Sequence, residues 1–276
     1  MFGKLETSDI PLIKAYMAKH SNEAIYLKYP VEQFEKGQLQ GVLYGYMKEQ
    51  SLIGLFYFSN KRSLILHFSD QQVLGNLNLL KAFKNHSPKY VKGEYKTMQL
   101  FYKIICRTVD HVHEDKSLLM TFNGRVEDLN AKTEFPTIVS NAAENGGVIQ
   151  DLKFFMRVEN AFGRNVKSVQ DIQKTLDELL EQNQFCLVHN GSNLIAQGII
   201  EEECEDMAII GGIYVDPQFR NRKLGKFISQ SLTKRCLDKG KAVYLFVLSN
   251  NRNAIALYEN IGFTALKTFS IFTIEY

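Results

Sequence analysis

The sequence predicts an α/β fold of the α+β kind, in which a mixed, mostly antiparallel sheet is flanked by helices and the chain forms two tandem lobes. Residues 209–215 are an apolar run rich in β-branched residues, and a short basic loop and an amphipathic pattern follow it. Residues 242–248 read as a buried strand with a helical pattern behind it. The first half of the chain shows a similar order of strands and helices, so we expect sheets covered by helices in both halves.

The first lobe begins with a helix and a meander. Residues 8–20 have a helical pattern, with Ser8 or Asp9 placed to cap it and Pro11 tolerated in its first turn. Three strand-like runs follow, separated by polar residues suited to turns, at residues 41–47, 52–58 and 63–68. Short connections of this kind predict an antiparallel meander.

The next elements suggest an internal repeat. A helical pattern at residues 73–83, a short strand at 89–95 and a helix at 97–105 complete the first lobe. Aligned by element, residues 63–70 fall opposite 208–216. We therefore predict a pseudo-repeat with lobes at residues 1–125 and 134–276, the first of them degenerate. The alternative is that both halves share an order of elements without being repeats.

The second lobe follows a polar connection at residues 124–133, which carries charges of both signs. We expect helices at residues 136–144 and 148–162, and a third that starts with the capping-box-like run 168–171 and ends near residue 181. Strands at residues 184–189 and 194–201 are joined by Asn190-Gly191, which favours a tight hairpin turn.

Composition restricts the classes of protein to consider. The 276 residues are 45% hydrophobic, and the net charge of +3 is too small to indicate nucleic acid as the main partner. The N-terminal residues lack the apolar core of a signal peptide, and no apolar run reaches the length of a membrane span. Four scattered cysteines form no CxxC pair, which favours the reducing cytoplasm.

The basic loop after residue 215 is a candidate anion site. It runs Arg220-Asn221-Arg222-Lys223-Leu224-Gly225 and leads into a helix. The first N–H groups of a helix have no partner within the helix, and the helix dipole places partial positive charge there. Such a junction binds anions such as phosphate. A merely solvated start of a helix is the alternative.

This loop resembles the pyrophosphate-binding signature of the GCN5-related N-acetyltransferases (GNAT), which reads Arg or Gln, two residues, Gly, one residue, then Gly or Ala. Arg220 and Gly225 match, whereas Lys223 replaces the middle glycine, and we expect it to keep a helical backbone with its side chain turned outward. A second block resembles the same family through an asparagine that begins a helix, a Leu-Tyr pair and a closing Gly-Phe, here Asn251, Tyr258, Gly262 and Phe263. The resemblance covers residues 184–276.

The resemblance implies acetyl-CoA as co-substrate. The backbone of Ile213, Tyr214 and Val215 would hold the pantetheine arm by strand augmentation, and Asn251 would bond the same arm. The loop from Arg220 to Gly225, with Lys226, would hold the pyrophosphate. From Arg220 to Lys241 there are eight Lys or Arg and one acid, a net charge of +7 that suits a coenzyme with several phosphates. A solvated basic face or a weak RNA contact is the alternative.

The catalytic groups are less complete. Tyr258 would lie near the thioester sulfur and donate a proton to the departing thiolate, although it could instead be a packing tyrosine. The strand at residues 207–215 carries no carboxylate to act as base before Asp216. The nearest acids are five carboxylates between Glu201 and Asp206, which would attract or deprotonate an amine or simply form a charged turn. No cysteine has an evident histidine partner, so direct transfer is favoured over an acyl-enzyme.

A metal site is not expected. Residues 106–115 contain His111 and His113 with acids nearby, but zinc sites require three or four converging ligands. A hairpin tip with solvated side chains explains the run.

Three functions remain open. The first is an acetyl-CoA-dependent N-acetyltransferase that acts on a small-molecule or peptide amine, without nucleic acid or membrane as partner. The second is a catalytically impaired CoA-binding sensor or assembly module, which Lys223 and the missing strand carboxylate favour. The third is a nucleic-acid-associated protein that uses the basic helix. The sequence does not identify the acceptor, the general base, the acyl-chain preference or the oligomeric state.

Overall fold

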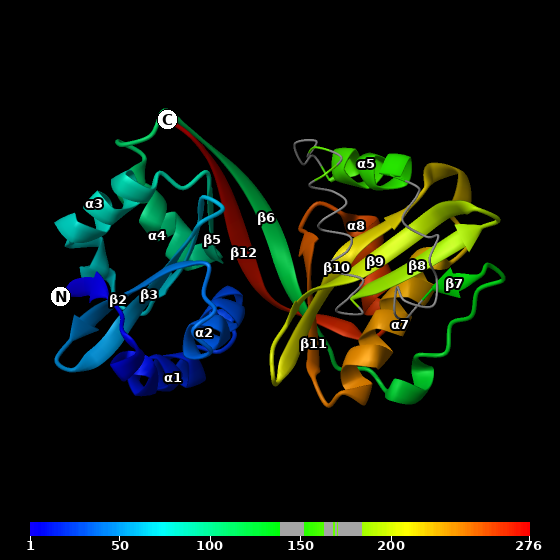
Figure 1. Cartoon of the computed structure of the whole chain (residues 1–276), viewed down its shortest axis with the longest axis horizontal. Coiled ribbons are helices and arrows are strands. Elements are labelled where there is room, and N and C mark those ends of the chain that lie inside the picture. Colours follow the sequence, from blue (N-terminus) through cyan, green and yellow to red (C-terminus); the bar gives the residue numbers. More distant parts are fainter. Residues whose placement is uncertain (139–151, 163–167, 169, 171–183) are drawn as a thin grey trace. The chain divides into compact units, whose positions relative to one another are not determined.

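The computed structural model describes residues 1–138, 152–162, 168, 170 and 184–276 (Figure 1). The chain divides into two compact units. Unit 1 comprises Met1–Leu119, Val247–Asn250 and Ala265–Tyr276, and unit 2 comprises Met120–Phe246 and Asn251–Thr264. The units are not consecutive halves of the chain, because the C-terminal strand pairs within unit 1. The lobe limits of 1–125 and 134–276 stay a prediction.

Unit 1 contains the predicted meander. The strands follow the order β1-β2-β3-β4-β5-β12-β6. Their bounds are β1 Phe2–Lys4, β2 Gly41–Lys48, β3 Ser51–Ser59, β4 Ser63–Phe68, β5 Tyr90–Glu94, β6 His111–Phe122 and β12 Phe263–Glu275, of which β6 and β12 are divided between the units. Strands β2, β3 and β4 pair antiparallel, as their short polar connections predict, whereas β4 and β5 pair in parallel.

The helices of unit 1 are α1 Ile10–Lys19, α2 Lys28–Glu35, α3 Leu77–His86 and α4 Tyr95–Ile105, with single 3-10 turns at Thr7–Asp9, Ile25–Leu27 and Gln71–Gly75. The helix predicted at residues 73–83 is therefore shifted. Asn76 causes the shift, because its side chain accepts the N–H groups of Asn78 and Leu79 and so fixes the start of α3. The core of the unit is rich in phenylalanine, with Phe56, Phe83 and Phe101 fully buried.

Some elements of unit 1 were not predicted. Helix α2 and strand β1 were missed, and His111 and His113 begin the twelve-residue strand β6 rather than forming a hairpin tip. Strand β12 was missed as well; its residues Phe269 to Thr273 pair with Glu94 to Tyr90 of β5. The run of residues 106–110 is a turn, and both histidines are exposed.

Unit 2 has a sheet whose strands follow the order β11-β10-β9-β8-β7. The strands are β7 Thr137–Ile138, β8 Phe185–Asn190, β9 Asn193–Glu203, β10 Met207–Val215 and β11 Ala242–Leu248; the helices are α5 Leu152–Ala161, α7 Leu224–Asp238 and α8 Arg252–Glu259, with 3-10 turns at Val126–Asp128 and Pro217–Phe219. All neighbours pair antiparallel except β10 and β11, which are parallel.

These elements agree with most of the predictions made from the sequence for the second lobe. The hairpin at Asn190-Gly191, the strands on either side of it and the two strand-helix blocks are confirmed. The prediction of a helix at residues 136–144 is wrong at its start, because residues 137–138 form strand β7, which pairs with β8. Residues 139–144 lie outside the described residues. Helix α5 lies within the predicted 148–162, and nearly all of the helix predicted at 168–181 also lies outside the described residues.

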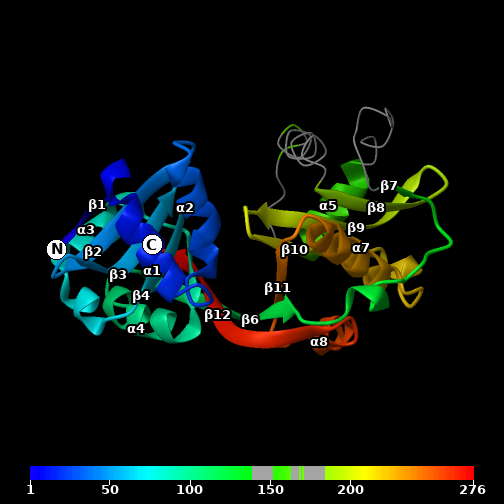
Figure 2. The same cartoon turned by 90° about the horizontal axis from the view of Figure 1, so that it is seen from below.

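Helices α5 and α7 cover opposite faces of the unit 2 sheet (Figure 2). Phe154 and Val158 of α5 pack on one face, against side chains that include Leu187 and Tyr214. On the other face α7 lies so close to β9 that a Cβ at Gly198 would stand 2.4 Å from Ile228. The two apolar faces bury the sheet between helices, which fixes the position of β10.

A buried histidine in unit 1 makes stability depend on pH. The side chain of His67 is 4% exposed and its Nδ1 lies 2.7 Å from the hydroxyl of Tyr16. Burial, followed by the neighbouring His20, lowers the pKa of His67 from 6.5 to about 4. The unfolded chain binds this proton more readily. The contribution of neutral His67 to the free energy of unfolding is therefore complete above pH 6.5 and is lost as the pH falls toward 4.

We expect His67→Gln to remove this pH dependence. Urea unfolding should show the wild type losing about 2 to 3 kcal/mol more than the variant between pH 7.5 and pH 4.5, from the shift from 6.5 to about 4. Other groups titrate in both proteins, so the difference between the two curves is the measurement. Parallel curves would show that His67 is not held neutral.

Candidate functional site

The centre of unit 2 is strand β10, which is paired differently along its two edges. Strand β9 pairs with it as far as Val215, opposite Ala196. The registered pairs with β11 run only from Met207 opposite Ala242 to Ile210 opposite Leu245, although β10 continues to Val215. The edge from Gly211 to Val215 that faces away from β9 is therefore left for another partner, as strand augmentation requires.

A bulge interrupts β10 where the two strands part. The register with β9 shifts between Gly211 and Tyr214. Gly212 has a φ of 57°, a left-handed conformation that glycine adopts without strain. Its carbonyl accepts a hydrogen bond from Gln197 Nε2 at 3.2 Å, which anchors the bulge to β9. Bulges often re-aim backbone groups beside active sites.

The loop after β10 presents backbone N–H groups at the start of α7. The first helical bond joins Phe227 N–H to Lys223 O, so the N–H groups of Leu224, Gly225 and Lys226 precede it. Among the described residues no side chain caps this helix. Arg220 is held at the start of the loop, where its Nε donates to Val215 O at 3.3 Å. This uncapped helix start is what anion binding requires, and the anion site itself stays a prediction.

The expectation that Lys223 keeps a helical backbone is wrong. Its φ is 61° and its ψ is 12°, which is left-handed, and Asn221 has a φ of 64°. A left-handed residue with a Cβ costs roughly 1–2 kcal/mol, and asparagine tolerates it better than lysine. At the position where the family signature has glycine, Lys223 thus adopts a left-handed turn with its side chain exposed.

The cations of α7 divide into two groups. Toward the end of the helix, Lys239 and Lys241 pair with Glu203 at 2.8 and 3.5 Å. Lys234 pairs with Asp238, and Arg235 is largely buried and donates to Phe185 O. Part of the predicted net charge of +7 is therefore neutralised by nearby carboxylates and is not directed at the start of the helix.

The second group surrounds the start of α7. Arg222 lies against the rings of Phe219 and Phe135 and stands 3.9 Å from Glu134. Arg220 and Lys223 are exposed, and Lys226 is half-buried. Four cations thus stand within seven consecutive residues around the exposed N–H groups, which concentrates positive charge where a phosphate would lie.

Helix α8 packs beside the start of α7. Its start is capped by Asn251, whose Oδ1 accepts the N–H of Ala254 at 3.2 Å and leaves the amide Nδ2 as a donor. Helix α8 packs on α7 so closely that a Cβ at Gly225 would stand 3.3 Å from Leu257. Gly262 ends the turn after the helix with a φ of 112°.

Tyr258 and Glu201 form the candidate catalytic pair. Tyr258 is 8% exposed and packs on Phe263. Burial, followed by the charge of Glu201, raises the pKa of Tyr258 to about 12, so its hydroxyl is protonated at neutral pH. The Glu201 carboxyl lies over the bulge, since a Cβ on Gly211 would stand 2.5 Å from it. A phenol and a carboxylate thus lie close enough for the charge of one to affect the pKa of the other, and the carboxylate lies beside Gly211 of β10.

Another acid of the run, Glu203, has a structural role, whereas Glu205 and Asp206 are exposed. Glu203 pairs with Lys239 and Lys241, and the turn that follows is closed by Cys204 N–H to Met207 O at 2.8 Å. The sequence grouped five acids without separating Glu201 from the others. Glu201 has no registered partner where the pairing of β9 with β10 shifts between Ile209 and Ile210, and its carboxyl lies beside Gly211.

The corresponding place in unit 1 is closed. Asp70 caps the 3-10 turn after β4 as Asp216 does after β10, each by accepting an N–H two residues on. However, Asn76 caps helix α3, and a Cβ on Gly93 of β5 would stand 2.7 Å from the backbone oxygen of Leu66 on β4. Unit 1 thus has the turn without exposed N–H groups or a gap for a coenzyme arm.

Two further properties concern metals and membranes. In the part of the chain that the structure describes, no group of three or more His, Cys, Asp and Glu side chains could hold a metal ion. The absence of a metal stays a prediction. No described helix combines the length and the apolar character that crossing a membrane requires.

Comparison with solved structures identifies the fold. An acetyltransferase of the GNAT family from Colwellia psychrerythraea is 15% identical, with a TM-score of 0.58 and 100% of both chains covered. A GCN5-related N-acetyltransferase from Sphaerobacter thermophilus is 12% identical, with a TM-score of 0.66 over 99% of this chain and 94% of that one. A tandem GNAT protein from the clavulanic acid biosynthesis pathway is 9% identical, with a TM-score of 0.58 over 99% and 97%.

The chain therefore has the GNAT acetyltransferase fold that the sequence predicts, and a tandem GNAT protein shares it along nearly its whole length. More specifically, residues 186–271 match the family model described as FR47-like protein. No curated protein matches the sequence. The family match covers β8 almost entirely, all of β9 to α8, and most of β12, which are the elements that build the site.

Proposed function

We propose that this protein is an acetyl-CoA-dependent N-acetyltransferase that transfers the acyl group directly to an amine. The observation that carries the proposal is the uncapped start of α7, flanked by cations and adjoining the free edge of β10. A coenzyme with a diphosphate at one end and a peptide-like arm at the other needs both features side by side.

The backbone of Ile213, Tyr214 and Val215 would pair with the pantetheine arm along the edge that β11 leaves. The N–H groups of the loop from Asn221 to Gly225 would hold the diphosphate, helped by Arg220 and Lys226. Asn251 keeps its Nδ2 for the arm, because only its Oδ1 is used as the cap.

The transfer would use Glu201 and Tyr258. Glu201 accepts a proton from the acceptor ammonium, and the neutral amine then attacks the thioester carbon. The C–N bond forms, the C–S bond breaks, and the departing thiolate takes the proton of Tyr258. The acylated nitrogen then loses its extra proton to the phenolate, whose pKa is raised to about 12, and Glu201 releases its proton to solvent.

The proposed acceptor is a small-molecule or peptide amine, with no nucleic acid or membrane involved. Cys186, Cys204 and Cys236 are buried and Cys106 is exposed, and none of the four is in a disulfide, which supports the cytoplasm as the proposed location. Direct transfer is favoured because burial raises the pKa of Cys186 and of Cys236 to about 11, which suits neither as a nucleophile.

A catalytically impaired coenzyme sensor is the second candidate. The observation in its favour is Lys223, which holds a left-handed turn that the family signature gives to glycine. Release of free CoA thiol with a panel of amines separates the two: turnover with any amine supports the transferase, and coenzyme binding without turnover supports the sensor.

Coenzyme binding is tested by removing two loop cations. We expect Arg220→Ala with Lys226→Ala to raise the Kd for acetyl-CoA by roughly 10- to 100-fold, because each cation contributes a charge-assisted contact to phosphate. Isothermal titration at two salt concentrations is the measurement, and the variant should also show a weaker salt dependence.

The matched control is Lys234→Ala with Arg125→Ala. These cations belong to the same unit and pair with Asp238 and Asp128 at 3.3 Å, so their loss changes the net charge equally without touching the loop. Equal affinities of the two double variants would mean that the loop does not hold the phosphates.

A further inference from the structure

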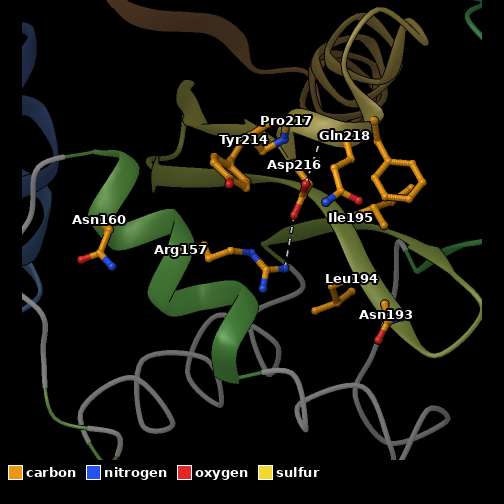
Figure 3. Close-up of a pocket in the computed structure, with 10 residues that line it drawn as sticks. Arg157, Asn160, Asn193, Leu194, Ile195, Tyr214, Asp216, Pro217 and Gln218 are labelled. Carbon is orange, nitrogen blue, oxygen red and sulfur yellow. Dashed lines mark hydrogen bonds and ion pairs between the residues drawn. The ribbon is translucent and has the colours of Figure 1, made fainter.

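Unit 2 has a pocket on the side of β10 that faces β9 and α5 (Figure 3). Its volume is about 700 Å³, within the range of sites for small organic ligands. Arg157 and Asn160 of α5 line it on one side, Leu194 of β9 on another, and Tyr214 and Asp216 at the end of β10 on a third. The described residues that line the pocket all belong to unit 2.

Among the described lining residues the charged side chains are Asp216 and Arg157, and they differ in how many of their polar atoms are already bonded. Asp216 is 16% exposed and uses both oxygens, since Oδ1 accepts Gln218 N–H at 3.2 Å and Oδ2 stands 3.3 Å from Arg157 Nη2. Arg157 is 45% exposed, and a guanidinium has five N–H donors. The pocket therefore offers donors for an anion, while its carboxylate is already bound.

The rest of the lining sets the size and character of the ligand. Leu194, Ile195, Tyr214, Pro217 and Phe219 form an apolar wall that includes two rings. Arg157 itself lies over the ring of Phe154, at 5.7 Å, which fixes the guanidinium plane. A planar, oriented guanidinium beside apolar surface suits a carboxylate attached to an apolar body.

The pocket is distinct from the proposed coenzyme site. The coenzyme arm would use the edge of β10 that β11 leaves, whereas the pocket adjoins the opposite edge, where Tyr214 is paired with Gln197 and Val215 with Ala196 of β9. Tyr214 also packs against Phe154 and Val158, and Glu201 is not among the described residues that line the pocket. A ligand in the pocket would not be an acetyl acceptor.

We propose that this pocket is a binding site for a small monocarboxylate with an aromatic or branched apolar body, whose carboxylate pairs with Arg157. The inference does not depend on the proposed transferase activity. Its wall, Asp216 to Phe219, leads directly into the loop of Arg220, so the ligand would bind beside the coenzyme loop without entering it.

The test adds phenylacetate as the probe to the full chain without coenzyme. Binding is measured by ligand-observed NMR titration. We expect a millimolar Kd, the affinity that about ten non-hydrogen atoms provide. Phenylacetamide, which has the same body without the charge, and acetate, which has the charge without the body, should each bind at least about tenfold more weakly. Equal binding of phenylacetamide or of acetate would overturn the proposed ligand class.

The protein variants locate the probe. Arg157→Gln should weaken phenylacetate at least about tenfold, because a hydrogen bond to a charged group is lost. Arg125→Gln is the matched control, since Arg125 also stands 3.3 Å from an aspartate in the same unit and should leave binding unchanged. Asn160→Asp places a second acid at the exposed rim and should weaken binding without removing Arg157.

The outcomes decide the proposal independently of the enzyme. Loss of binding in both Arg157→Gln and Asn160→Asp, with unchanged melting temperatures, supports the site. Absence of phenylacetate binding to the wild type, or equal binding by the Arg157 variant, overturns it. Either result stands whether or not the protein turns over acetyl-CoA, because no coenzyme is present.

Discussion

Replacing Glu201 with glutamine is expected to lower kcat for acetyl transfer by about 10² to 10⁴-fold, the usual contribution of a general base. Glutamine keeps the shape of the side chain over Gly211, where there is no room for a Cβ, but it cannot take the proton of an ammonium. Steady-state kinetics against pH is the measurement. In the wild type, the fall of kcat/KM at acidic pH should report protonation of this carboxylate. That fall should be absent in the Glu201→Gln variant.

The control for Glu201 is Glu205→Gln, which removes an acid of the same run from the exposed turn. Its kcat should stay near the wild-type value, and both variants should bind acetyl-CoA as the wild type does. Should Glu201→Gln retain full turnover, or should both variants lose it equally, the base is not Glu201 and the acids act only through their summed charge.

Local patterns sufficed for the strands and helices that build the site. The apolar run before Asp216, the basic loop and the helix after Gly225 were each readable from residue order, because each depends on interactions within about ten residues. Asn251 and Gly262 likewise predicted both ends of α8 through capping and turn chemistry.

What the sequence did not predict depends on pairing between distant segments. Strand β12 pairs with β5 across more than 170 positions of the chain, and no local pattern shows that its end completes the first unit. The position of Glu201 over Gly211 depends on a register shift between β9 and β10. The left-handed turn at Lys223 was missed because the residue type itself argues against it.

The two units show what distinguishes the proposed coenzyme site from the corresponding turn in unit 1. After β4 and after β10 an aspartate caps a 3-10 turn in the same way. In unit 1 Asn76 then satisfies the N–H groups of the next helix, and none of residues 71–76 is a cation. In unit 2 the helix starts uncapped among lysines and arginines. The choice of cap, rather than the topology, decides where an anion can bind.

Replacing Tyr258 with phenylalanine is the second prediction with a large effect. We expect kcat to fall by roughly 10²-fold, because the thiolate then leaves without the proton of a positioned acid, while the Kd for acetyl-CoA changes little. Burial raises the pKa of Tyr258 to about 12, so its loss should lower activity evenly across neutral and moderately alkaline pH rather than shift a titration.

Tyr258→Phe also separates catalysis from packing, because phenylalanine keeps the ring against Phe263 at a centroid distance near the present 6.0 Å. If Tyr258 is only a core residue, both stability and kcat should match the wild type. A melting temperature that is unchanged together with a lowered kcat assigns the hydroxyl to the reaction. Tyr244→Phe, on the neighbouring strand β11, removes a phenol from the same unit and should leave kcat unchanged, so that an equal loss in both variants would point to a general effect of lost hydroxyls.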